Sequence, residues 1–175
     1  MILDALLQFD TAANLAQVVG TYNSSNVIDL GLVGIPLSAA GGGARDMGIG
    51  DDPALKFFAA TTAGFTSGGA GTLQIKVQGA PDNGAGAPGT YYDMLLTPVY
   101  ALATLTVGQT LMDFDFPGVP PGQAVPRFIR LAYIIAGATM TAGTVVSYIV
   151  LDRIDQIQGT TGVLSGYPPG IAIAN

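Results

Sequence analysis

Residues 72–78 read TLQIKVQ, and this stretch decides the class of fold because apolar and polar side chains alternate along it. Leu73, Ile75 and Val77 fall on one face of an extended chain, while Lys76 and two glutamines fall on the other. Such alternation predicts an antiparallel strand with one face in a core and one face in water. The stretch therefore indicates a β-sheet protein.

The same alternation recurs along the chain, between turns rich in Gly and Pro. Residues 13–19 fit either a strand or a short helix. About eight short strands favour an all-β fold, a jelly-roll-like antiparallel β-sandwich with long Gly/Pro-rich loops, over a barrel or an α/β fold. The expected strands span residues 27–30, 55–65, 72–78, 91–96, 101–107, 110–116, 127–135 and 145–151.

The last two expected strands differ from the others because they are apolar on both faces. Residues 127–135 (RFIRLAYII) and 145–151 (VVSYIVL) are interrupted mainly by Arg130 and Ser147. A two-sheet sandwich buries only the inner face of each sheet, and no long amphipathic helix follows to cover the outer face. We therefore expect another chain to cover it.

A chain of 175 residues suits one domain. We expect residues 1–153 to form a single jelly-roll domain. Residues 154–175 are expected to be a C-terminal extension, either extended or docked on a neighbouring subunit. Between residues 31 and 53 lies a long Gly-rich loop, and a loop of that length is expected to be functional or docked.

The chain contains no His, Cys, Trp or Glu. These absences exclude a Ser-His-Asp triad, a Cys-His pair, a His/Cys zinc site and any imidazole that titrates near neutral pH. We therefore expect a protein that binds rather than an enzyme, and we expect no cofactor.

Only 10% of the residues are charged, against about 25% in average globular chains, while 49% are hydrophobic. Such a composition favours a surface that lies largely against partner proteins. The net charge of −6 argues against binding to nucleic acid or to an acidic membrane. The N-terminus lacks a positively charged region, and no apolar run approaches the ~18 residues of a transmembrane helix.

Two pairs of side chains invite a catalytic interpretation. Asp113 and Asp115 share one face of an expected strand about 7 Å apart, near the range for inverting glycosidases. An exposed polar face is the favoured interpretation, because no Trp platform for a sugar accompanies them. Lys56 or Lys76 as the partner of a Ser nucleophile is a minor alternative, since Lys76 lies on a solvated face.

The Gly-rich loop carries Asp46, Asp51 and Asp52, whose oxygens suit a hard cation such as Ca²⁺. A structural turn is favoured instead, because the spacing does not match an EF-hand. The glycines at 41–43 lack the Lys-Ser/Thr of a phosphate-binding loop. We therefore expect no metal site.

An interface is the expected functional site. Apolar side chains of the N-terminal segment MILDALLQF form either the first strand or a contact with a neighbouring subunit. The outer faces of the last two strands add further candidates, and Arg side chains among them are suited to pairing across an interface. The candidates are Ile2, Leu3, Leu6, Leu7, Phe9, Phe128, Arg130, Ile134, Val146 and Tyr148.

The chain resembles the capsid cement (decoration) proteins of short-tailed bacteriophages over roughly residues 1–153. The similarity lies in an ordered set of segments rather than in a catalytic fingerprint, and residues 154–175 fall outside it. The segments are MILDALLQF (1–9), NVIDLG (26–31), RDMGIGDDP (45–53), GTLQIKVQG (71–79) and the long stretch from RFIRLAYII to VLDR (127–153).

This resemblance implies a jelly-roll protein on the outer surface of the virion, which decorates the shell as a symmetric oligomer and clamps adjacent subunits of the major capsid protein. Among oligomers a homodimer is the commonest, and a trimer is the alternative. It implies no enzymatic activity and no cofactor. Two alternatives stay open at this point. One is a carbohydrate-binding module for host adhesion, in which Tyr91, Tyr92, Tyr100 and Tyr167 stack on sugars. The other is a glycoside hydrolase that uses Asp113 and Asp115.

Overall fold

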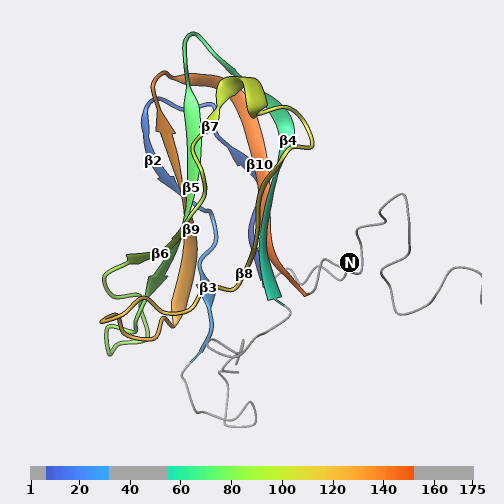
Figure 1. Cartoon of the computed structure of the whole chain (residues 1–175). Coiled ribbons are helices and arrows are strands. Elements are labelled where there is room, and N and C mark those ends of the chain that lie inside the picture. The colour runs from blue at the N-terminus through green and yellow to red at the C-terminus, as the bar shows by residue number, and fades with distance from the viewer. Residues whose placement is uncertain (1–6, 32–54, 152–175) are drawn as a thin grey trace, which may run out of the picture.

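The structure is a computed structural model that describes residues 7–31 and 55–151, which form two antiparallel sheets packed face to face (Figure 1). Sheet A contains, in spatial order, β1 (Gln8–Asn14), β10 (Met140–Leu151), β4 (Leu55–Ser67) and β8 (Thr110–Asp115). Sheet B contains β2 (Gly20–Asn23), β9 (Phe128–Ala136), β5 (Thr72–Ala80) and β6 (Tyr92–Leu96). Two short strands join sheet B, since β3 (Ile28–Asp29) pairs with β9 and β7 (Tyr100–Ala101) with β5.

Strands near the start of the described sequence pair with strands near its end. In sheet A the first strand, β1, pairs with the last strand, β10. In sheet B the second strand, β2, pairs with the penultimate strand, β9. Because all of these pairings are antiparallel, the prediction of an all-β sandwich is confirmed.

The core lies between the two sheets and follows the alternation of the sequence. Leu73, Ile75 and Val77 of β5 are fully buried, as their period of two predicts. On β9 the inward residues are Ile129, Leu131, Tyr133 and Ile135, all at most 1% exposed. The opposite face of each strand therefore points away from the core.

Two expected elements differ from the structure. The expected strand over residues 101–107 is wrong, because the chain leaves sheet B after β7 and forms a 3₁₀ turn, η2 (Leu102–Thr104). This crossing places the buried Leu105 between the sheets, where its carbonyl accepts from Phe65 N at 3.0 Å. Residues 13–19 are neither one strand nor a helix. Asn14 ends β1, and its Oδ1 accepts from Ala16 N at 3.0 Å.

Candidate interaction surfaces

The outer face of β9 is covered by side chains of its own sheet. Arg130 lies over the ring of Tyr91, with 3.6 Å between Cζ and the ring centroid. Its Nε donates to Oε1 of Gln78 at 3.0 Å. Asp93 accepts from Gln78 at 2.8 Å and lies 2.6 Å from Nζ of Lys76. These polar side chains leave little of the apolar outer face of β9 exposed to water.

The burial of β9 corrects an expectation drawn from its sequence. Ala132, the cross-strand partner of Lys76, is fully buried within the single chain. Phe128 is 6% exposed, and the guanidinium of Arg127 lies 4.9 Å from its ring centroid. The expectation that another chain must cover this face is therefore wrong, because long polar side chains cover it. Of the candidates on β9, Arg130 and Ile134 remain half-buried and reachable.

The outer face of sheet A carries a second apolar cluster, which we call the outer cluster. Phe58 of β4 and Tyr148 of β10 are cross-strand partners with ring centroids 5.1 Å apart. Val150 packs with them, and Ala60 and Val146 lie at its margin. Tyr148 is only 7% exposed, so it offers little area to a partner, whereas Val146 is half-buried and reachable.

Among the N-terminal candidates, Ile2, Leu3 and Leu6 lie outside the described residues. Leu7 is half-buried and packs against the core. Phe9 is fully buried, and its ring stacks on Phe57 with centroids 6.0 Å apart. The assignment of Phe9 to an interface is therefore wrong, because its side chain belongs to the core of its own chain.

A buried polar network, which the sequence patterns did not indicate, links the two sheets. Asp10 of β1 is 3% exposed, and its Oδ2 accepts from the hydroxyl of Tyr133 on β9 at 2.7 Å. That hydroxyl also lies 2.8 Å from Oγ of Ser147 on β10. The other carboxylate oxygen accepts from Ser25 N at 2.9 Å. The network therefore ties three strands and one loop across the core.

Alkaline pH should weaken the fold through Tyr133. Burial, together with the charge of Asp10, raises the pKa of Tyr133 well above its ordinary value of 10.0. Above that ordinary pKa the unfolded chain releases the proton while the folded chain keeps it, so the free energy of unfolding falls as pH rises. Urea unfolding of the native protein and of Tyr133→Phe, followed upward from about pH 9, measures this loss. The decline should be shallower in the variant, and equal slopes would contradict the assignment.

Arg127 forms an ion-pair clamp that holds together three segments at the end of the sandwich where β9 begins (Figure 1). Arg127 donates to both carboxylate oxygens of Asp29, at 2.8 and 2.9 Å, and also to Asp82. The Arg127 hydrogen bonds lower the pKa of Asp29. For Asp82, burial works to raise the pKa, but hydrogen bonds from Gly84 N and Arg127 lower it overall. The clamp fixes β3 and the β5–β6 loop against the start of β9.

The residues considered for catalysis and sugar binding are engaged within the chain. Asp115 pairs with Lys56 at 3.2 Å on the outer face of sheet A. The ring of Tyr91 lies under Arg130, and the hydroxyl of Tyr92 donates to the carbonyl of Ala124 at 2.7 Å. Within residues 7–31 and 55–151, no three carboxylates come close enough to hold a metal ion. Asp46, Asp51, Asp52, the glycines at 41–43 and Tyr167 lie outside the described residues.

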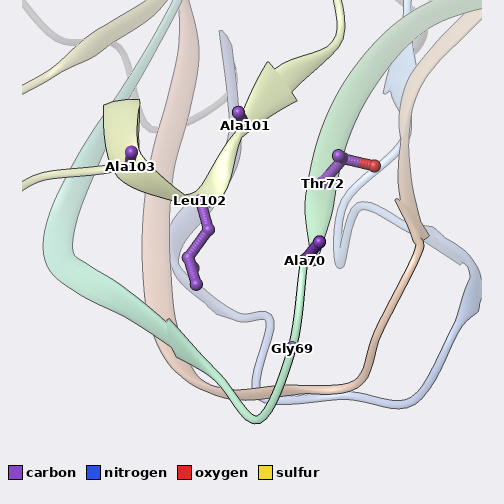
Figure 2. A pocket seen from close by; sticks show the side chains of 7 residues that line it. Gly69, Ala70, Thr72, Ala101, Leu102 and Ala103 are labelled. Carbon is purple, nitrogen blue, oxygen red and sulfur yellow. The ribbon is translucent and has the colours of Figure 1, made fainter.

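An apolar hollow of about 390 Å³ opens between the β4–β5 turn and the segment from β7 to η2. Figure 2 shows the side chain of Leu102 extending from the wall formed by residues 101–103, beside the segment that carries Gly69 and Ala70. Thr72 is the only polar side chain of the lining, and Leu102 N donates to the carbonyl of Gly71 at 3.1 Å, which ties the walls together. The hollow is lined by Gly69, Ala70, Gly71, Thr72, Ala101, Leu102 and Ala103. Its chemistry suits an apolar group.

No helix among the described residues is long and apolar enough to span a membrane.

Comparison with known proteins places the chain in a family. No curated protein matches the sequence. A family model named Bbp16 matches residues 13–149, a range that begins near the end of β1 and reaches nearly to the end of β10. The match spans most of the chain, and the protein belongs to the Bbp16 family.

Proposed function

We propose that this chain is a structural virion protein, a capsid cement or decoration protein that binds the outside of a phage head and clamps adjacent major capsid subunits. The ordered resemblance to such proteins over residues 1–153 motivates the proposal, and membership of the Bbp16 family is compatible with it. The order of strands, with β1 beside β10 and β2 beside β9, is the one expected for a jelly roll and supports it further.

The observation that carries the proposal is that the described cations are engaged within the chain, whereas the described hollow is apolar. Each cation among the described residues is engaged within the chain: Lys56 with Asp115, Lys76 with Asp93, Arg127 with two aspartates and Arg130 with Tyr91. The described hollow, in contrast, is apolar and contains one hydroxyl. Such a surface is suited to contact with another protein rather than to proton transfer or phosphate binding.

The proposed mechanism is stabilisation by mass action. A clip that binds the assembled shell and not the free subunits shifts the equilibrium toward the shell. Apolar contact contributes only about 25 cal/mol per Å² of buried area, so one copy adds little. Many copies on a symmetric shell, each a homodimer or alternatively a trimer, add up to a large effect.

Rupture of phage heads tests the proposal. Heads assembled without the protein should rupture at a lower temperature, and in a milder osmotic shock, than heads to which the purified full chain has been added back. Addition of an unrelated acidic protein of similar mass is the control and should change nothing. Identical rupture points with and without the chain would refute the proposal.

A further inference from the structure

Among the residues that the structure describes, one end of the sandwich is built from segments without a charged side chain. Four segments meet there, and none contains Asp, Glu, Lys or Arg; we call this the charge-free end (Figure 1). The segments contact one another: Met140 N donates to Gln17 O at 2.9 Å, and Leu102 N donates to Gly71 O at 3.1 Å. The four segments are residues 15–20, 67–72, 101–109 and 136–144.

The charge-free end exposes large apolar side chains to water, beside neutral polar ones such as Thr104, Thr106 and Gln109. Val18, Val19 and Val107 are 61%, 54% and 69% exposed. The hollow beside η2 opens at the same end, because its walls are residues 69–72 and 101–103. The ion-pair clamp around Arg127 lies at the opposite end. The two ends of the molecule therefore present different chemistry to a partner.

We infer that the charge-free end is the surface that seats on the phage shell, and that the hollow receives one bulky apolar side chain of a capsid subunit. This inference rests on the proposed function. A charged partner group would lose its hydration at this end without gaining a counter-charge, which is costly. A strongly polar group would find only the hydroxyl of Thr72 in the hollow. The lack of charge at this end therefore favours an uncharged patch on the capsid subunit, and the hollow favours an apolar side chain within that patch.

The geometry of the hollow fits an anchoring side chain. Its volume of about 390 Å³ falls in the range of ligand pockets, and the hollow is open to solvent rather than enclosed. Its walls are preformed, because Leu105 N donates to Leu102 O at 3.1 Å and Thr104 Oγ1 to Ala101 O at 2.8 Å. A preformed hollow needs little ordering when a partner binds. The exposed valines extend the contact beyond the hollow, which favours a protein surface over a small molecule.

Co-sedimentation with heads that lack the protein tests the inference. Val107→Asp places a charge on the charge-free end, and Val125→Asp is the matched control, at a valine 52% exposed in the loop before β9. Ala103→Leu fills the hollow, and Ala85→Leu in the exposed β5–β6 loop is its control. All four side chains are exposed, so each variant should melt near the temperature of the native protein, which a thermal scan verifies.

Val107→Asp and Ala103→Leu should each weaken binding at least about tenfold, while both controls bind like the native chain. If the native chain binds heads and all four variants bind equally well, the inference is overturned and the proposed function stands. If Ala103→Leu binds like the native chain and the two controls while Val107→Asp does not, the assignment of the hollow is overturned. If the native chain does not bind heads at all, the proposed function itself fails.

Discussion

Asp10→Ala should lower the free energy of unfolding by about 3 kcal/mol. The substitution removes the acceptor of Tyr133 OH and of Ser25 N, which lie 2.7 and 2.9 Å from the carboxylate. A buried donor left without its partner costs about 1–3 kcal/mol. Tyr133 OH is such a donor, with Ser147 as its remaining partner, whereas the bond from Ser25 N is part-buried and adds less. Urea denaturation, with the slope of the transition checked for constancy, measures the loss.

Asp93→Ala is the matched control for Asp10→Ala. Asp93 also contacts two polar side chains, but it lies on the outer face of sheet B and its side chain is 35% exposed. Water replaces the lost partners there, so this substitution should cost less than about 1 kcal/mol. Equal losses for the two variants would show that the buried network does not hold the sheets together.

Gly143→Ala should lower the free energy of unfolding by about 2–6 kcal/mol, because it combines two penalties. A Cβ at this position would clash with the ring of Phe65, because it would lie closer to three ring atoms than van der Waals contact allows. Phe65 is buried, so its ring has little room to move. Overpacking of this kind costs about 1–3 kcal/mol. The backbone φ of +138° adds about 1–3 kcal/mol for a residue with a side chain. Thermal and urea unfolding measure the total.

Gly108→Ala separates these two penalties. Gly108 has a φ of +78°, but a Cβ there would meet no atom within 4 Å. Its substitution should cost about 1–2 kcal/mol, the backbone penalty alone. If Gly143→Ala were no more destabilising than Gly108→Ala, the close packing of β10 against Phe65 would be disproved.

The strands that alternate cleanly could be predicted from the sequence, whereas the sites where a strand bends could not. TLQIKVQ lies in β5 with its three apolar residues buried, as expected. Asp10 was missed because the register of β1 shifts on both sides of it. This bulge lets the consecutive residues Phe9 and Asp10 both be buried, which a period of two does not allow.

The candidate interface was predicted only in part, because sequence patterns do not show how far a side chain reaches across a sheet. The outer face of β9 is mostly apolar in the sequence of that strand alone. In the folded sheet, Lys76 and Gln78 of the neighbouring strand and Arg130 of β9 itself lie along this face. The charge-free end joins residues as far apart as Val18 and Val107. Only the folded arrangement of the loops brings them to one surface.

The most direct test of the account is a difference map from electron cryomicroscopy of phage heads with and without the chain. A protein that decorates the shell should add density to the outer surface, between neighbouring capsid subunits and at symmetry-related positions. The charge-free end, with Val107 and η2, should point toward the shell. Heads that bear no additional outer density after incubation with the full chain would contradict the account.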